Sequence, residues 1–274
     1  MVTEIQMPSG ARPAAPARGA AALPHFAATL AVAYAGVDGE RWWPGGGGFE
    51  VMVGALLVQN TAWNNAAKAL AALRRAGRLS PHRIAELSEA ELGALIRSSG
   101  CWRQKARRLR ALAAWLVTGY GGSVERLFAQ PAATVRALLL EREGVGEETA
   151  DTMLLYAGSH PRLIVDSYMR RLLERHGIRS PRERLERSVP RQAVWLRRWH
   201  ALVVENGKRY CHRREPDCHA CPLGPLLARI PSRQGARSMP APGPARAGLR
   251  RSQRRPHMVQ GVRTPAGPER RGLP

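Results

Sequence analysis

Residues 141–177 read EREGVGEETADTMLLYAGSHPRLIVDSYMRRLLERHG, and this stretch says most about how the chain folds. The tripeptide Gly144-Val145-Gly146 lies between two segments of helical character, so it predicts a tight turn between two helices. The backbone N–H groups of such a turn, at the start of a helix, can bind a phosphate oxygen. Taken alone, the tripeptide fits an ordinary corner between helices better than a binding site, so its meaning depends on its surroundings.

Asp166 follows the second glycine by twenty residues, at the end of the apolar run Leu163-Ile164-Val165 and just before a helical segment, 167–176. An Asp in that place is a good N-cap and stabilises a helix by about 1 kcal/mol. The same carboxylate could carry chemistry. Both interpretations stay open on the residues alone.

Outward from this stretch, the pattern from residue 26 to residue 227 is helical almost throughout. Ser80-Pro81 is typical of a helix start, and Ser88 with Glu91 forms a capping box for a helix that we expect to end near Gly100. Only residues 162–165 resemble a strand, and one short strand has no partner to pair with. The expected fold class is therefore all-α. Helical spacing also places one apolar face on the segment that follows Gly100: Ala106, Leu109, Leu112, Ala113 and Leu116.

The two ends of the chain differ from its middle in composition. Residues 1–24 are rich in Ala, Pro, Gly and Arg without a sustained period, and we expect a disordered extension there. Residues 228–274 contain eleven Arg and one acid, Glu269, so they contribute +10 of the formal net charge of +22 and are expected to form a basic, disordered tail. The remaining +12 lies on residues 1–227. Both parts are basic, which favours a polyanion as partner.

The sequence also excludes several classes of protein. No apolar stretch approaches the ~20 residues of a membrane span, and the N-terminal segment is interrupted by Pro13, Pro16 and Arg18, which argues against a secretory signal. We therefore expect a cytoplasmic protein, monomeric and without a membrane partner. Three of its four cysteines cluster, which in a reducing compartment favours a metal site over disulfides: Cys211, Cys218 and Cys221.

The hairpin, the following Gly- and Pro-containing loop, and the Asp before a helix together resemble the helix-hairpin-helix DNA glycosylases of the endonuclease III superfamily. The resemblance runs from about Trp42 to Cys221 and includes Gln59 in LLVQNTAW and the Gly100-x4-Lys105 segment. It implies a two-lobed fold: a helical barrel lobe over 45–158, with the hairpin at about 138–158, and a second lobe from 25–44 and 159–227. A cleft for double-stranded DNA would lie between the lobes.

Within that family the Asp lies near the sugar of a nucleotide turned out of the duplex, because a stacked base hides its glycosidic bond. The resemblance thus makes Asp166 the catalytic residue. Members that also cut the backbone carry a Lys two residues after the second hairpin glycine, where its amine forms a Schiff base. Here that position is Glu148, a residue that also suits the first turn of a helix. We therefore expect a monofunctional glycosylase. Two alternatives stay open: a bifunctional glycosylase and AP lyase acting on oxidised pyrimidines, and a non-catalytic DNA-binding protein.

The base that is removed is suggested by RWWPGGGGFEVMVGALLVQNTAW, which is similar to a 3-methyladenine glycosylase branch of the superfamily. Trp42, Trp43 and Trp63 are the candidates for a pocket that binds an alkylated purine, because a cationic base is attracted to an indole face. Each could equally be a core residue. Gln59 matches the family position that probes the duplex beside the extruded base, or it satisfies a neighbouring helix. Three cations of the Gly100 segment are left unassigned: Lys105, Arg107 and Arg108.

The cysteine spacing matches three of the four ligands of the family's [4Fe–4S] loop, and the fourth position is Leu227. This departure leaves three interpretations: no cluster, a cluster held by three cysteines and another ligand such as His212 or His219, or a change of reading frame that begins beyond Gly224. A zinc site from the same cysteines and a His ranks lower. Cys101 lies outside the spacing and is expected to be a small buried hydrophobe.

Overall fold

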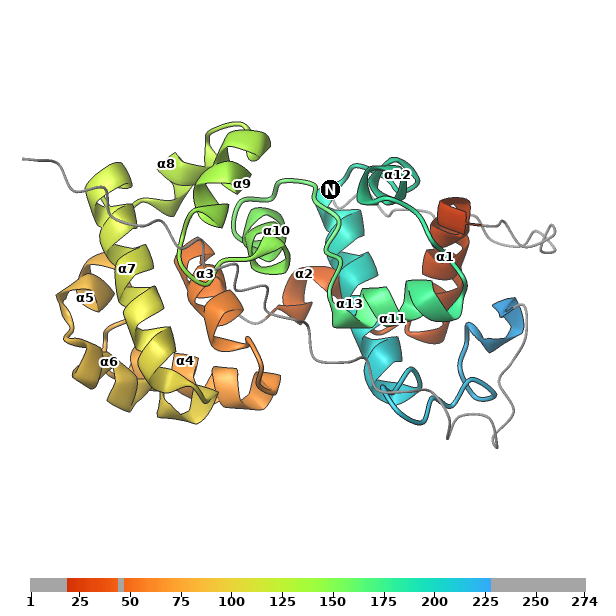
Figure 1. Ribbon diagram of the computed structural model, residues 1–274, viewed down its shortest axis with the longest axis horizontal. Helices are drawn as coiled ribbons and strands as arrows, with labels where there is room; N and C mark the ends of the chain where they lie inside the picture. Colours follow the sequence, from red (N-terminus) through yellow and green to blue (C-terminus); the bar gives the residue numbers. More distant parts are fainter. Residues whose placement is uncertain (1–18, 44–46, 228–274) are drawn as a thin grey trace, which may run out of the picture. The chain divides into compact units, whose positions relative to one another are not determined.

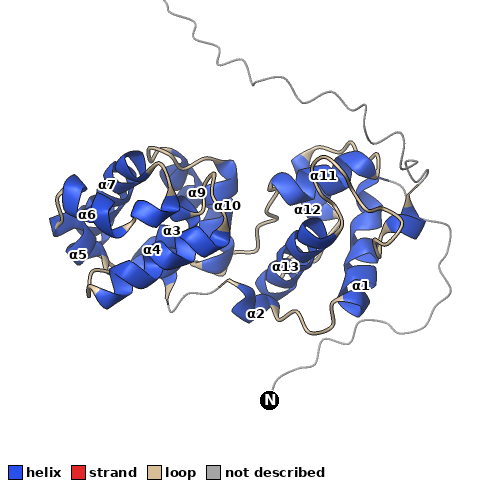
Figure 2. Ribbon diagram, turned by 90° about the horizontal axis from the view of Figure 1, so that it is seen from below, coloured by secondary structure: helices blue, strands red, loops and turns tan. Residues whose placement is uncertain are grey.

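The computed structural model describes residues 19–43 and 47–227, and all regular elements in these ranges are helices (Figure 1, Figure 2). The predicted all-α class is thereby confirmed for this part of the chain. Residues 1–18, 44–46 and 228–274 lie outside the described residues, and with them most of the predicted extension and the whole predicted basic tail. Contacts divide the chain into two units, 1–237 and 238–274, and the unit 238–274 lies wholly outside the described residues.

A first hydrophobic core gathers helices from the middle of the chain, and it contains side chains from Phe49 to Leu154. Long apolar residues fill it, among them Met52, Leu109 and Leu154, each at most 1% exposed. The elements that supply it are α3 (Gly48–Leu57), α4 (Trp63–Arg75), α5 (Pro81–Glu86), α6 (Glu89–Leu95), the turn η2 (Arg97–Ser99), α7 (Trp102–Tyr120), α8 (Val124–Phe128), α9 (Ala132–Leu140) and α10 (Glu147–Tyr156).

A second core joins the start of the described chain to its end, so segments far apart in sequence pack together. Trp199 is its largest fully buried side chain, and Leu23 and Leu30 from the N-terminal helix are 0% exposed in it. Its elements are the turn η1 (Gly19–Ala22), α1 (Leu23–Ala33), α11 (Ser167–Arg175), α12 (Arg182–Arg187), α13 (Ala193–Arg209) and the turn η3 (Gly224–Leu226), while the short α2 (Gly39–Trp42) packs on α13.

The helix starts predicted from polar residues are confirmed. Ser80 accepts a hydrogen bond from the N–H of Arg83, and Ser88 and Glu91 form the reciprocal capping box, with donor–acceptor distances of 2.9 and 3.2 Å. The helix expected to run to Gly100 differs slightly: α6 ends at Leu95 and a short turn follows. The apolar face predicted after Gly100 is buried along α7.

The predicted N-terminal extension differs in part from the structure, and the strand-like segment 162–165 has no strand partner among the described residues, as expected. Of the extension predicted over 1–24, Gly19–Ala22 form a turn and Leu23 begins α1, while 1–18 lie outside the described residues. Alanine favours helix, and the buried Leu23 side chain anchors the turn to the second core. Residues 162–165 are not helical, and no strand is present in the ranges 19–43 and 47–227. Leu163 and Ile164 are instead 2% and 3% exposed and join the second core directly.

A buried ion cluster ties elements of both cores together. Asp151 on α10 is 0% exposed, and its carboxylate contacts the guanidinium groups of Arg136 at 3.0 Å, Arg162 at 3.4 Å and Arg182 at 2.7 Å. These arginines lie on α9, in the segment before Asp166 and on α12. Because several charge-assisted bonds satisfy the carboxylate, its burial is tolerated. The cluster thereby fixes the segment that leads into α11.

Lys105, left unassigned on the sequence, is a buried structural residue of α7. Its side chain is 4% exposed, and its Nζ donates hydrogen bonds to the carbonyl oxygens of Leu57, at 2.7 Å, and Ser99, at 2.6 Å. Burial lowers the pKa of Lys105. The ammonium thus connects the end of α3, which leads to Gln59, with the turn that precedes α7.

We expect Lys105→Met to lower the free energy of unfolding by about 2 kcal/mol, because the apolar stem is kept while two buried carbonyl groups lose their donor. Urea denaturation followed by circular dichroism measures this. Lys68→Met on α4 is the control, because Lys68 is exposed, and its effect should stay within about 0.5 kcal/mol. Equal effects of the two substitutions would show that the buried ammonium contributes nothing.

Candidate active site

Asp166 lies at the N-terminus of α11, where it serves as the N-cap. Its Oδ1 accepts a hydrogen bond from the backbone N–H of Met169 at 2.7 Å, and the residue is 7% exposed. The fold holds it there because Ile164 just before it and Met169 just after it are both buried in the second core. The N-cap role of Asp166, one of the two interpretations from the sequence, is therefore confirmed. It occupies one carboxylate oxygen and leaves the other for a different partner.

That second oxygen faces His200 of α13. The Asp166 Oδ2 and His200 Nε2 atoms lie 3.7 Å apart, and the imidazole Nδ1 lies 2.8 Å from the hydroxyl of Tyr156 on α10. The ring of Trp42 meets the imidazole edge-on, with centroids 5.2 Å apart. The carboxylate thus has an ordered, largely buried surrounding made by three helices.

Two opposing effects act on the ionisation of Asp166. Burial by itself raises the pKa of the carboxyl, but the nearby imidazole of His200 and the backbone N–H groups of Met169 and Tyr168 outweigh burial and hold the pKa below its usual value. The side chain is therefore an anion at neutral pH. An anion fixed at a helix N-terminus is also favoured by the helix dipole.

The predicted hairpin is formed by the residues that the sequence indicated. Gly144 has φ +80°, in the left-handed region, and Gly146 is the N-cap of α10. A Cβ at Gly144 would lie 2.4 Å from the Arg108 side chain, so glycine is needed there for space as well as for conformation. Val145 is 5% exposed and anchors the turn in the first core, while Gly146 remains at the surface.

Gln59 is held against this hairpin. Its Nε2 donates hydrogen bonds to the carbonyl oxygen of Gly144 and to the hydroxyl of Thr149, both at 2.9 Å. The bond to Thr149 of α10 fits the alternative in which Gln59 satisfies a neighbouring helix, and its contact with the duplex stays a prediction. The cations Arg107 and Arg108 of α7 also reach the hairpin, where both contact the carboxylate of Glu143.

Glu148 lies in the first turn of α10, on the side that faces Asp166. Its half-exposed carboxylate pairs with Arg170 of α11 at 2.9 Å. Partial burial raises the pKa of Glu148, and the nearby negative charge of Asp166 raises it further. The residue at the Lys position of the lyases is thus an electrostatic neighbour of Asp166, and its side chain has no amine.

The structure brings the three predicted tryptophans together around Trp43. Its ring centroid lies 6.5 Å from that of Trp42, 5.2 Å from that of Trp63 and 5.1 Å from that of Tyr156. All three indoles are partly exposed, and those of Trp43 and Trp63 pack against the first core. Trp42 also donates its Nε1–H to Glu205 at 3.2 Å. The arrangement offers aromatic faces and edges beside His200 and Asp166.

The positions of Tyr156 and His200 beside Asp166 were not predicted from the sequence. Both lie on helices whose other residues follow an apolar pattern, so each is typical of a core position. No local motif identifies them, because their importance comes from contact with a residue on a third helix.

The three predicted cysteine ligands lie in the C-terminal loop, where the protein itself surrounds each thiol. Cys211 Sγ accepts a hydrogen bond from Arg175 at 2.8 Å, and Cys221 Sγ lies 3.5 Å from the amide nitrogen of Asn206. Cys218 is buried, and burial raises the pKa of its thiol. Within the part of the chain that the structure describes, no group of three His, Cys, Asp or Glu side chains is placed to hold a metal ion.

Because Leu227 occupies the position of the fourth cysteine, these three thiols do not fit a four-thiolate [4Fe–4S] cluster. His212 and His219, the other proposed ligands, add no such group either. Cys101, expected to be buried, is exposed, with φ +45°, because it occupies the left-handed position directly before α7.

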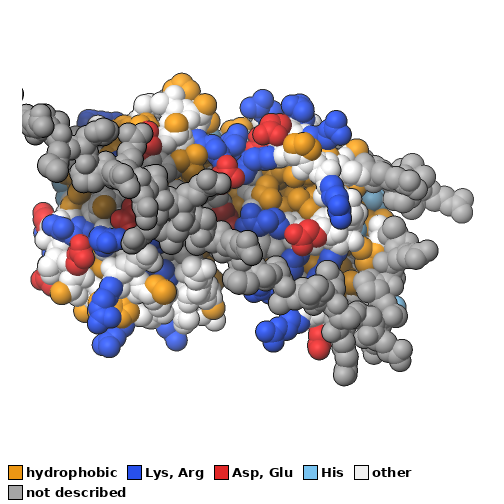
Figure 3. Space-filling view, viewed as in Figure 1, with side chains coloured by type: hydrophobic (Ala, Val, Ile, Leu, Met, Phe, Trp, Pro, Cys, Tyr) orange, Lys and Arg blue, Asp and Glu red, His pale blue; other side chains and the backbone are white. Residues whose placement is uncertain are grey.

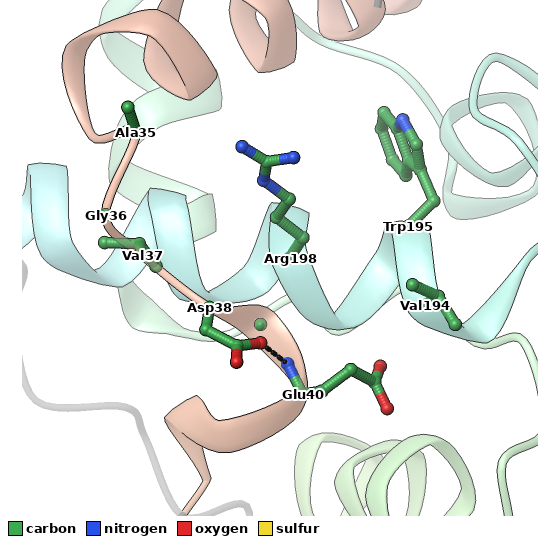
Figure 4. Close-up of a pocket in the computed structure, with 9 residues that line it drawn as sticks. Ala35, Gly36, Val37, Asp38, Glu40, Val194, Trp195 and Arg198 are labelled. Atoms are coloured by element: carbon green, nitrogen blue, oxygen red, sulfur yellow. Dashed lines mark hydrogen bonds between the residues drawn. The ribbon is translucent and has the colours of Figure 1, made fainter. Parts of the chain in front are cut away.

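A pocket of about 310 Å³ lies beside α2 and α13, and Figure 4 shows the Arg198 side chain and the Trp195 indole that line it. None of the predicted site residues lines this pocket. On the face drawn in Figure 3, Lys and Arg side chains occur over the helices of both cores and lie among Asp and Glu side chains. No helix among the described residues has the length and apolar character needed to cross a membrane.

Comparisons with known proteins agree on one family. Residues 53–196 match the family model described as "HhH-GPD superfamily base excision DNA repair protein". A candidate DNA repair glycosylase of Methanocaldococcus jannaschii is 35% identical over 192 residues, which cover 67% of this chain and 87% of that protein.

Two solved structures share the fold. One is a 3-methyladenine DNA glycosylase of H. pylori bound to 1,N6-ethenoadenine, with a TM-score of 0.61, 24% identity and coverage of 70% of this chain and 98% of that one. The other is a non-covalent endonuclease III–DNA complex, with a TM-score of 0.64, 23% identity and coverage of 77% and 96%. At these identities the likeness shows the fold alone.

Proposed function

The chain belongs to the HhH-GPD superfamily of base excision DNA repair proteins, and from that membership we propose that it is a monofunctional DNA glycosylase that removes a damaged base from double-stranded DNA. The observation that carries the proposal is the buried Asp166 anion at the start of α11, next to the hairpin helix α10 and beside a group of aromatic side chains. The two DNA-bound and base-bound structures that share the fold support DNA as the partner.

In the proposed reaction the damaged nucleotide is turned out of the duplex, because its glycosidic bond is inaccessible while the base is stacked. The bond between the base and the sugar C1′ breaks, its electron pair leaves with the base, and positive charge develops on the sugar. The Asp166 carboxylate stabilises that charge. A water molecule then forms the new C1′–O bond and gives up a proton to Asp166 or to solvent, leaving an abasic site.

The lowered pKa of Asp166 bears on its role in this reaction. A carboxylate held below its usual pKa is a weak base, so proton abstraction is the smaller part of its work. Stabilising the cationic sugar requires only that the group remain ionised and correctly placed. The hydrogen bond from the Met169 N–H supports this role, because it favours the ionised form and fixes the position of the carboxylate.

The absence of strand cleavage follows from Glu148. A Schiff base with the sugar needs a primary amine, and a carboxylate cannot form one. The ion pair with Arg170 favours the ionised form of Glu148 and so opposes the burial and the Asp166 charge that raise its pKa.

The proposed substrate is an alkylated purine, and the proposed pocket is the group Trp42, Trp43 and Trp63 with Tyr156. A methylated purine carries positive charge, and a desolvated cation over an indole face gains about 1–2 kcal/mol. The mutual contacts of these rings hold their edges and faces in fixed orientations. The hairpin would bind a phosphate of the duplex through its backbone N–H groups. The lobes over 45–158 and over 25–44 with 159–227 would enclose the DNA, with one protein molecule per site.

We expect the purified chain to release free methylated purine from methylated duplex DNA, with identification of the base by mass spectrometry. The same duplex without methylation is the control and should yield no free base. A duplex that contains oxidised pyrimidines forms the third arm. Release from that arm alone would favour the bifunctional alternative, while release from no alkylated, deaminated or oxidised duplex would overturn the proposal that the chain is a glycosylase.

A further inference from the structure

We propose that His200, oriented by Tyr156, is the positioning residue for Asp166. The inference rests on the proposed function, and it adds two residues that neither the sequence motifs nor the family comparison identified. It starts from one fact of geometry: both oxygens of the Asp166 carboxylate face a donor group. Oδ1 accepts from the Met169 N–H at 2.7 Å, and Oδ2 faces His200 Nε2 at 3.7 Å.

The tautomer of His200 follows from its other contact. Nδ1 lies 2.8 Å from the Tyr156 hydroxyl, whose single proton can be donated either to this nitrogen or, over a longer 3.4 Å, to the carbonyl oxygen of Arg197. If the hydroxyl donates to Nδ1, the neutral ring carries its proton on Nε2, where it points at Asp166. A carboxylate accepts that proton favourably, so the Asp166 carboxylate and the shorter Tyr156 contact favour the same tautomer.

The 3.7 Å separation is longer than an ordinary hydrogen bond, and separations of this kind in sites without substrate shorten when the substrate binds. Packing also holds the His200 imidazole in place. His200 is 7% exposed, and the Trp42 indole packs against it edge-on. Tyr156 in turn packs against Trp43, with centroids 5.1 Å apart. The ring that orients Asp166 is therefore supported by the aromatic group proposed to bind the base.

Other charged groups surround this chain of contacts and act on the same carboxylate. Glu148 from α10 is the nearest acid, and Arg170 from α11 pairs with it, so the two partly compensate. Arg197 of α13 pairs with Glu40 of α2 beside Tyr156, which makes a second compensated pair. Met169 offers only a backbone N–H. His200 is thus the side chain whose proximity offsets the effect of burial on the Asp166 pKa.

The role has a consequence for pH dependence. Because the contact favours the ionised carboxyl, it lowers the pKa of Asp166, and the active anion persists to lower pH. Removing the donor raises that pKa, so activity is lost at a higher pH as the solution is acidified. If His200 only filled space, its substitution would change the rate by the same factor at every pH.

The test is the pH profile of single-turnover base release from methylated duplex DNA by the full chain. We expect His200→Phe to move the acid limb upward by about one pH unit, which is a tenfold loss at a pH below the limb. His200→Gln, which keeps an N–H donor, should restore most of the wild-type profile. Tyr156→Phe removes only the hydroxyl that fixes the tautomer and should give a smaller upward shift. A uniform fall in rate with an unchanged acid limb in both His200→Phe and Tyr156→Phe would overturn the proposal.

A second measurement separates this inference from the proposed function. The carbon NMR signal of the Asp166 carboxyl, assigned by its loss in Asp166→Asn, is followed through a pH titration of the free protein. An upward shift of the titration midpoint in His200→Phe supports the positioning role even if no substrate is found. An unchanged midpoint overturns it, whatever the enzyme does to DNA.

Discussion

Asp166→Asn is expected to reduce the single-turnover rate of base release by about a thousandfold, while duplex DNA is still bound. The amide keeps the size of the side chain and still accepts the Met169 N–H, so the helix cap remains. What is lost is the negative charge opposite the developing cation, and removing one such preorganised electrostatic contact costs about 10²–10³ in rate. Rates come from rapid mixing with excess enzyme, and affinity from fluorescence anisotropy on the same duplex.

Asp38→Asn is the matched control for that experiment. Asp38 is also an N-cap, of the short α2, and accepts from the Glu40 and Arg41 N–H groups, but its side chain is 56% exposed. Its substitution should leave the rate within about twofold. DNA binding by Asp166→Asn should hold or rise, because a negative charge near the phosphates is removed. A full wild-type rate in Asp166→Asn would show that this carboxylate is not catalytic and would favour a DNA-binding protein without chemistry.

The second large effect is expected from Glu148→Lys, which should give a covalent adduct with DNA that contains an abasic site when borohydride is present. The new amine would lie beside Asp166, where it can attack C1′ of the opened sugar with loss of water. Borohydride then reduces the resulting C=N bond to a stable amine. Trapped complex is measured on a denaturing gel with labelled DNA, and the wild-type chain should give none.

Glu147→Lys is the control, since Glu147 is adjacent in sequence but pairs with Arg136 in the direction of α9. It should trap no more than the wild type. Trapping by the wild-type chain itself would establish the bifunctional alternative, with another amine in the role. Failure of a folded Glu148→Lys variant to trap would mean that position 148 does not face the sugar.

Local features of the fold could be predicted from the sequence where one residue acts on its neighbours along the chain. The capping box of Ser88 and Glu91, the N-cap role of Asp166 and the left-handed Gly144 are of this kind. Each depends on interactions within a few residues, so spacing alone predicts it. The all-α class followed for the same reason, because helical periodicity is local.

Features that depend on contacts between distant residues could not be predicted. Lys105 looked like one cation in a charged run, yet its ammonium is buried between two carbonyl groups from other segments. His200 and Tyr156 are 44 residues apart and meet only because α10 and α13 pack together. The resemblance assigns Gln59 to the duplex, and the hydrogen bond from its amide to the hairpin carbonyl is a contact that the sequence does not show. In each case the sequence shows the residue type but not its partner.

The cysteine loop keeps three of the family's four cysteine positions, and two of these thiols have protein partners in the structure. Three of four cysteines keep the spacing, but Arg175 and Asn206 now contact two of the thiols. These contacts supply polar partners to the thiols of Cys211 and Cys221. The loop still packs on the second core through the buried Leu223.

The ion cluster around Asp151 has a consequence for how the protein responds to ionic strength. Mobile ions screen charges that are in contact with solvent, whereas a carboxylate that is 0% exposed, enclosed by three guanidinium groups, is screened far less. Phosphate contacts of a basic protein, by contrast, weaken steeply as salt rises. Added salt should therefore weaken contacts with a polyanion much more than it weakens the Asp151 ion cluster, which fixes the segment before α11.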